Sequence, residues 1–250
     1  MSPILGSGLK SKSFGFSSVQ RVVPNFVSTN LILHLDAAES SSYSGSGSTW
    51  SDLSSSGYHA TLLNSPTWNS SGYFTFNGTN QNGYFTKPNP NPAGAVSCEF
   101  WFYNTTVADT ILLHKGYHYT TRFLDGNTWS WSDSNYNYSG FGYRTISNIF
   151  AVNTWKQIVV TKDTSNDVRI YKNGSLVDTR TAWAPTSGTG VGPTYASATA
   201  FLTGYSNDDT VPSGGYMLTG RLAIVRMYSS VLSGAQVTQN FDAYKTRFGL

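Results

Sequence analysis

The sequence predicts an all-β protein, an antiparallel two-sheet sandwich closed by one short C-terminal helix. Aromatic residues make up 15% of the 250 residues, charged residues only 12%, and there are 24 glycines. This composition suits short strands and turns rather than helices. Short apolar segments follow one another with Gly, Asn, Ser and Pro between them. A convincing helical pattern occurs only within residues 220–249.

The predicted strands begin at Leu31 and recur along the rest of the chain. The Asn173-Gly174 pair between two of them is a strong signal for a two-residue hairpin. No linker is visible after Leu31, so we expect one domain, residues 31–250, preceded by an extended arm, residues 1–30. The predicted strands are 31–35, 60–63, 73–76, 84–86, 96–103, 110–114, 155–162, 168–171, 176–179, 200–205 and 217–228.

The C-terminal helix is predicted from its caps and its apolar face. Ser233 and Gln236 have the spacing of a capping box, in which each side chain binds the other residue's backbone. Gly249 follows two basic residues and is the expected stop signal. We expect the apolar face to seat the helix against the sandwich, and we assign it no chemistry. That face consists of Val237, Phe241, Tyr244 and Phe248, at i, i+4, i+7 and i+11.

Cysteine and leader signals bear on the compartment. Cys98 is the only cysteine, so no intrachain disulfide can form and a reducing compartment is favoured. We expect Cys98 to be a buried apolar residue rather than a reactive thiol. Residues 1–12 contain no apolar h-region, so no secretory signal is expected. No run approaches the ~18 apolar residues of a membrane span, which excludes membrane insertion.

The arm carries the whole net charge of +3, because residues 1–30 hold three basic residues and no acid. Three charges are too few for a nucleic-acid-binding face. Such a Ser/Gly-rich segment would be disordered alone, so it either packs on its own domain or docks on a partner, and we favour the partner. The expected docking residues are Ile4, Leu5, Lys10, Lys12, Phe14, Phe16 and Arg21.

Several segments together resemble a concanavalin A-like lectin/glucanase domain of the laminin-G-like type. The resemblance implies a jelly-roll sandwich of two curved antiparallel sheets. The closing Tyr-Lys-x-Arg-Phe-Gly is similar to that of virion proteins of tailed phages, where such domains are capsid decorations or fibre tips. The segments are Leu33–Ala37, Ser42–Ser54, Tyr73–Gly78, Trp155–Asp163, Val168–Gly174 and the terminal strand–helix unit.

The family also contains glucanases, so catalytic acids have to be considered. A retaining glycosidase needs two carboxyl groups about 5–5.5 Å apart, which the family places in a Glu-x-Asp-x-x-Glu pattern. This chain has only Glu39 and Glu99, and no two acids stand at i, i+2. His114 and His118 flank a predicted turn with no Glu between them, which argues against zinc. We therefore expect no enzyme activity and no required cofactor.

Calcium is the common ion of the family, and two turns offer oxygen ligands for it. Calcium takes six to eight oxygens, with backbone carbonyls often contributing. The alternative is that these residues are solvated and cap hairpins. The candidate ligands are Asp125, Asn127, Asp208 and Asp209.

The segment 129–143 is the most suggestive for binding. On an alternating strand, Trp129 and Trp131 share a face with polar residues. Aromatic rings stack on sugar faces while Asp and Asn bond the hydroxyl groups, which makes a glycan platform. Two alternatives remain, namely core aromatics and a protein interface. The candidate glycan-binding residues are Trp129, Trp131, Asp133, Asn135, Tyr136 and Tyr138.

Two functions therefore remain open. The first is a virion structural protein, assembled in the host cytoplasm, that docks on other capsid or tail proteins through residues 1–30 and works in a larger assembly. The second is a carbohydrate-binding adhesin for host surface glycans, with calcium as an optional cofactor.

Overall fold

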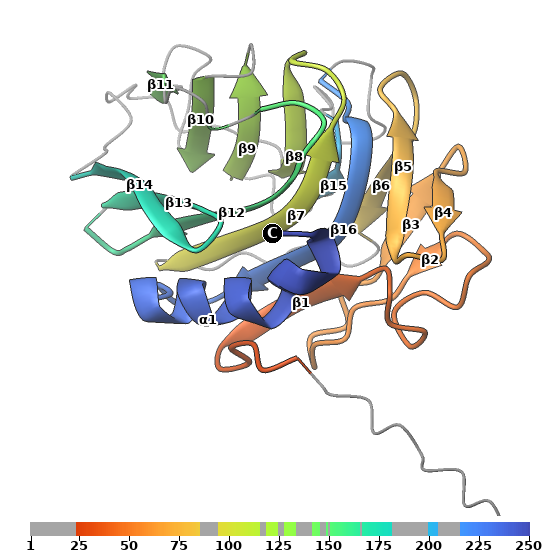
Figure 1. Ribbon diagram of the computed structural model, residues 1–250, viewed down its shortest axis with the longest axis horizontal. Coiled ribbons are helices and arrows are strands. Elements are labelled where there is room, and N and C mark those ends of the chain that lie inside the picture. Colours follow the sequence, from red (N-terminus) through yellow and green to blue (C-terminus); the bar gives the residue numbers. More distant parts are fainter. Residues whose placement is uncertain are drawn as a thin grey trace, which may run out of the picture.

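The computed structural model describes residues 24–85, 95–115, 119–124, 128–133, 142–145, 149, 151–165, 167–181, 200–204 and 216–250. These residues form two antiparallel sheets and one C-terminal helix, arranged as a jelly-roll sandwich (Figure 1). The fold class predicted from the sequence is thus confirmed.

Sheet A holds the strands on which the helix packs. Its order is β14-β13-β12-β7-β16-β5-β4, and β1 also pairs with β16. Strand β16 serves both partners because its first half pairs with β5 and its second half with β1, around an irregularity between Leu222 and Ile224. The strands are β1 (Leu31–Asp36), β4 (Thr67–Asn69), β5 (Tyr73–Asn77), β7 (Val96–Asn104), β12 (Trp155–Lys162), β13 (Val168–Lys172), β14 (Ser175–Arg180) and β16 (Thr219–Tyr228).

Sheet B forms the opposite layer, in the order β11-β10-β9-β8-β15-β6-β3-β2. Every pairing in it is antiparallel, both in local hairpins such as β8–β9 and between strands far apart in sequence such as β15 and β6. The strands are β2 (Thr49–Trp50), β3 (Ala60–Leu63), β6 (Asn82–Phe85), β8 (Thr110–Lys115), β9 (Tyr119–Leu124), β10 (Thr128–Asp133), β11 (Gly142–Thr145) and β15 (Phe201–Leu202).

The main core lies between the two sheets. Phe100 and Ile158 of sheet A and Leu113 of sheet B are fully buried in one cluster. Cys98 belongs to the same cluster and is 0% exposed, as expected for a packed apolar residue. Burial raises the pKa of its thiol, so it stays protonated and unreactive.

Helix α1 (Gly234–Tyr244) covers the outer face of sheet A, the face turned away from sheet B (Figure 1). The capping box is confirmed, because Ser233 Oγ accepts from the Gln236 N–H at 3.3 Å and Gln236 Oε1 accepts from the Ser233 N–H at 2.9 Å. The last turn is a 3₁₀ helix, η1 (Lys245–Phe248), stopped by Gly249 at a φ of 70°. Among the described elements, no helix is long and apolar enough to cross a membrane.

The Asn173-Gly174 hairpin between β13 and β14 is confirmed as well. Both residues have positive φ, 49° and 79°, the requirement of a type I′ turn. A Cβ on Gly174 would lie 3.1 Å from the Phe241 ring of α1. The turn therefore both connects β13 to β14 and packs against the helix.

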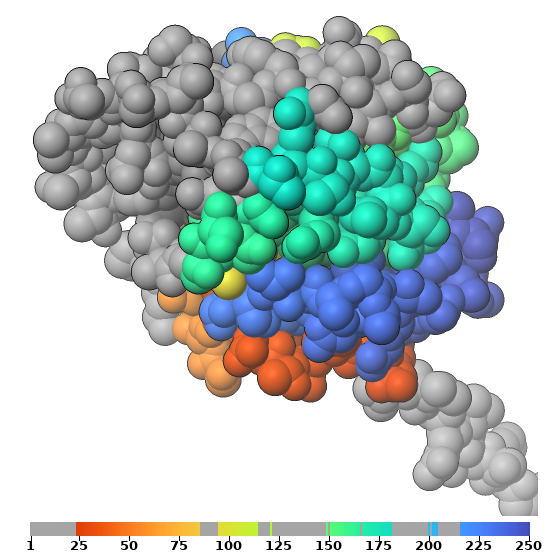
Figure 2. Space-filling model, turned by 90° about the vertical axis from the view of Figure 1, so that its left-hand side faces the viewer, coloured from red at the N-terminus to blue at the C-terminus, as the bar shows by residue number. Residues whose placement is uncertain are grey.

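Residues 24–30, which the sequence places in the arm, lie beside helix α1. The Val27 N–H donates to Asn240 Oδ1 at 2.8 Å. Figure 2 shows the helix (blue) between the β13–β14 hairpin (cyan) and the N-terminal residues (orange-red). The described end of the arm therefore packs on its own domain. The docking residues predicted further upstream, Ile4, Leu5, Lys10, Lys12, Phe14, Phe16 and Arg21, lie outside the described residues.

Candidate functional site

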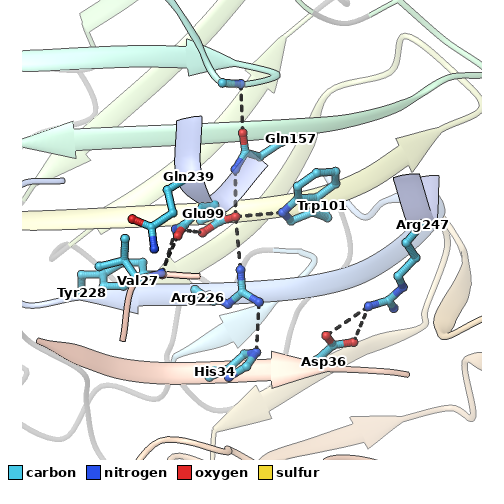
Figure 3. Close-up of polar contacts among 12 residues, drawn as sticks. Val27, His34, Asp36, Glu99, Trp101, Gln157, Arg226, Tyr228, Gln239 and Arg247 are labelled. Carbon is cyan, nitrogen blue, oxygen red and sulfur yellow. Dashed lines mark hydrogen bonds and ion pairs between the residues drawn. The ribbon is translucent and has the colours of Figure 1, made fainter. Parts of the chain in front are cut away.

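A buried polar network centred on Glu99 lies between sheet A and helix α1 (Figure 3). Trp101 Nε1 and Gln157 Nε2 donate to Glu99 Oε1 at 2.8 and 2.9 Å. Asn240 Nδ2 of the helix donates to Oε2 at 2.7 Å. Arg226 of β16 completes the set with an ion pair of 3.4 Å to Oε1, and both side chains are fully buried. One carboxylate thus connects β7, β12, β16 and α1.

Arg226 is enclosed by aromatic rings as well as by its counter-charge. Its guanidinium lies 4.1 Å from the Phe26 ring and 4.5 Å from the Tyr244 ring, a favourable cation–π arrangement. Arg226 Nη2 also lies 3.2 Å from His34 Nε2. Burial, reinforced by Arg226, lowers the pKa of His34 to about 2. The imidazole is therefore neutral and accepts the guanidinium N–H.

Strand β10 carries the first three residues of the predicted glycan platform. Trp129, Trp131 and Asp133 occupy alternate positions on it, between β9 and the edge strand β11. Trp131 is registered opposite Thr121, whose side chain is fully buried. The other three, Asn135, Tyr136 and Tyr138, lie outside the described residues.

A family model for the Laminin_G_3 domain, described as the concanavalin A-like lectin/glucanases superfamily, matches residues 77–238. The chain belongs to the concanavalin A-like lectin/glucanases superfamily. The match covers most of both sheets and the beginning of α1. It includes Glu99 and its partners on β7, β12 and β16, as well as strand β10, and ends just before Asn240. A search of curated protein sequences found no match.

Solved structures share this superfamily fold at low sequence identity. The botulinum neurotoxin serotype D binding domain has a TM-score of 0.61 and 13% identity, over 85% of this chain and 51% of that one. The type G receptor binding domain gives 0.59 and 15%, over 86% and 51%. The serotype D domain in complex with N-acetylneuraminic acid gives 0.57 and 12%, over 85% and 50%. The chain therefore spans about half the length of these binding domains, and the likeness concerns the fold.

A superfamily member with glucanase relatives raises the question of whether Glu99 is a catalytic acid. Both of its oxygens already accept hydrogen bonds, and the residue is 0% exposed beneath α1. A nearby second carboxylate, Asp36, is likewise fully buried and receives both bonds of Arg247 Nη1, at 2.8 and 3.0 Å. Substrate has no access to either group in this arrangement. Their geometry suits holding the helix, and we assign them that role.

The four predicted calcium ligands lie outside the described residues, so calcium binding stays a prediction. They are Asp125, Asn127, Asp208 and Asp209. Within the part of the chain that is described, no group of three or more His, Cys, Asp or Glu side chains could hold a metal ion.

The sequence reasoning missed the Glu99 network. Two signals were available, since Glu99 is the one charged residue in β7 and Arg226 is the one charged residue in the apolar stretch 222–228 of β16. A lone charge in such a strand needs a buried partner. Opposite charges in two strands of one sandwich therefore indicate an ion pair.

Proposed function

We propose that this superfamily member binds carbohydrate, without catalysis, through the region of strand β10. The observation that carries the proposal is the alternation of Trp129, Trp131 and Asp133 on a strand one position from the edge of sheet B. Indole rings offer flat apolar faces to the C–H groups of a sugar, and a carboxylate accepts bonds from its hydroxyls. The superfamily of lectins and the N-acetylneuraminic acid complex of a structural neighbour support the same function.

A glycan array probed with the wild-type chain and with a Trp129→Ala, Trp131→Ala double variant tests this proposal. We expect binding to at least one glycan class, lost in the double variant while the thermal midpoint is retained. Trp68→Ala is the matched control, because Trp68 lies on β4 at the far edge of sheet A. Glycan binding that survives in the double variant, or no binding by the wild type, would reject the proposal.

A second candidate is anchoring in a virion through the arm. The observation favouring it is that the chain just after residue 23 is fixed to the domain, by Val27 on Asn240 and by Phe26 on Arg226. Whatever residues 1–23 bind would thereby be linked rigidly to the sandwich. Deleting residues 1–23 should abolish incorporation into particles and leave unfolding unchanged. Full occupancy of the truncated chain in particles would contradict anchoring.

A further inference from the structure

A patch of half-buried side chains lies on the outer face of sheet A, the face on which helix α1 packs. Its members come one each from the neighbouring strands β5, β16, β7 and β12 (Figure 1). Arg221 of β16 is registered opposite Tyr103 of β7, and Tyr103 opposite Trp155 of β12. Trp155 and Tyr73 of β5 pack against the hydrophobic cluster beneath the helix, which places the set on this outer face. We call Tyr73, Tyr103, Trp155 and Arg221 the Arg221 patch.

The aromatic rings of the patch converge on Trp155. The centroid of its ring lies 5.6 Å from that of Tyr73 and 5.8 Å from that of Tyr103, and both contacts are T-shaped. Phe248 of η1 supports Trp155 from the side of the helix, at 4.7 Å between ring centroids. Edge-to-face contacts of this kind are favourable and fix the positions of the rings. Because each ring of the patch is still partly exposed, the patch presents an ordered aromatic surface to solvent.

Arg221 is held by these rings rather than by a counter-charge. Its guanidinium carbon lies 5.1 Å from the centroid of the Tyr73 ring and 4.6 Å from that of Tyr103, within the range of a cation–π interaction. Among the described residues, no carboxylate forms an ion pair with Arg221, and no acceptor takes a hydrogen bond from its guanidinium. The side chain is only half-buried, so its N–H donors are open to an approaching ligand. A guanidinium whose position is fixed by aromatic rings is ready to bind a carboxylate with two parallel hydrogen bonds.

The surroundings of the patch favour a sugar over a protein as the bearer of that carboxylate. Thr75 of β5 is exposed and registered opposite Arg221, and Thr67 of β4 is exposed and registered opposite Thr75. These positions offer hydroxyl groups, which suit the hydroxyls of a sugar. A stable protein interface buries about 800 Å² on each partner and needs further apolar anchors, which these threonines do not supply.

We propose that the Arg221 patch binds an acidic sugar, with Arg221 as the donor to its carboxylate and the aromatic rings as the surface on which the sugar ring lies. The patch belongs to sheet A, whereas the proposed function places carbohydrate on strand β10 of sheet B. The inference therefore goes beyond the proposed function and does not rest on it. It gives the chain a second contact region, in which Arg221 distinguishes acidic from neutral sugars.

The test is a ligand-observed NMR titration of the full chain with two acidic sugars, sialyllactose and a hyaluronan tetrasaccharide. Each is compared with its carboxyl methyl ester, which keeps the shape of the sugar and removes its charge. We expect at least one acid to bind about tenfold more tightly than its ester, a typical gain for a charge-assisted contact. The preference should shrink between about 20 mM and about 300 mM NaCl, because the charge is partly exposed and is screened by salt. The two sugars tell a sialic acid site from a uronic acid site.

Substitutions of Arg221 identify the donor. Arg221→Met should abolish the preference for the acid over the ester, with the thermal midpoint retained because the side chain is half-buried. Arg221→Lys keeps the charge without the planar fork and should retain only a small part of the preference. Arg169→Met is the matched control, since Arg169 is a partly exposed arginine of sheet A that already lies 4.0 Å from Asp167. That control should leave binding unchanged.

The outcomes separate this inference from the proposed function. Acid-specific binding that persists in the Trp129→Ala, Trp131→Ala double variant and is lost in Arg221→Met supports the Arg221 patch, whatever happens at β10. If neither acid binds more tightly than its ester, or if Arg221→Met keeps the preference, the inference is wrong. Loss of binding in the double variant alone would assign the acidic sugar to β10 and also reject the patch. A glutamate-rich peptide that binds in place of the sugars would reject it in favour of a protein partner.

Discussion

Replacing Glu99 by Gln is expected to destabilise the domain by about 3–5 kcal/mol, the cost of leaving a buried charge without its partner. Arg226 is fully buried and has Glu99 as its counter-ion at 3.4 Å. Trp101 Nε1 and Gln157 Nε2 both donate to one Glu99 oxygen. A glutamine keeps one acceptor oxygen but turns the other position into an NH₂ donor. That donor would face Asn240 Nδ2, now 2.7 Å from Oε2, so a hydrogen bond becomes a donor–donor clash.

Urea unfolding followed by tryptophan fluorescence and circular dichroism measures this loss. With an m-value of about 3 kcal/mol per M, the midpoint should fall by about 1 M or more. Asp242→Asn is the matched control, another acid-to-amide change. Asp242 pairs with Lys245 at 2.7 Å, but both side chains are about half exposed. Exposed pairs of this kind contribute about 0–1 kcal/mol, so the control should barely shift the midpoint.

A double-mutant cycle tells whether charge is the cause. Arg226→Met removes the cation, and the Glu99→Gln, Arg226→Met double variant removes both charges. We expect the double variant to lose less than the sum of the single losses, with a coupling of at least about 1 kcal/mol. Additive losses, or a loss below about 1 kcal/mol for Glu99→Gln at unchanged m, would refute the reasoning.

Three further substitutions test a buried histidine, a hairpin glycine and a helix N-cap. The pKa of His34 is about 2 in the folded protein against 6.5 in the unfolded chain, so the unfolded chain binds an extra proton below pH 6.5. The free energy of unfolding therefore falls as the pH drops below 6.5, by up to about 1.4 kcal/mol per pH unit. Between pH 7 and pH 5, the urea midpoint of His34→Gln should fall less steeply than that of the wild type. Gly174→Ala should cost about 1–2 kcal/mol from backbone strain and the Phe241 contact, more than Gly47→Ala, where φ is also positive but no atom lies within 4 Å. Ser233→Ala removes the N-cap of α1 and should lower the free energy of unfolding by about 1 kcal/mol, measured by thermal or urea unfolding.

Features that depend on a few neighbouring residues could be predicted from the sequence. The Asn173-Gly174 turn is specified by two residues that tolerate positive φ. The start of α1 is specified by the reciprocal bonds of Ser233 and Gln236. The last turn of the helix nevertheless differs from the predicted α-helix, because it is a 3₁₀ turn. From this turn Phe248 reaches Trp101, with 4.6 Å between the ring centroids. That contact is tertiary, so helical periodicity alone does not specify it.

The Glu99 network could not be predicted in the same way, because its members are far apart in sequence. Glu99 and Arg226 are separated by 127 positions, and His34 and Arg226 by 192. They meet because β16 lies between β1 and β7 in sheet A. That pairing follows from the packing of the whole sandwich. A charge within an apolar stretch of each strand predicts that a partner exists, whereas only the strand order identifies it.

Asn240 of the C-terminal helix connects the end of the arm to sheet A. The apolar stripe of the helix predicted purely hydrophobic packing on sheet A. Asn240, however, lies on the same face and is fully buried. Its amide nitrogen donates to Glu99 Oε2, and its amide oxygen accepts from the Val27 N–H. The helix therefore holds the end of the arm, residues 24–30, against sheet A. Removing residues 1–30 would break this clamp and expose Arg226, because Phe26 leaves with the arm. A deletion that ends at residue 23 keeps both contacts, so only that deletion separates a function of the arm from the stability of the domain.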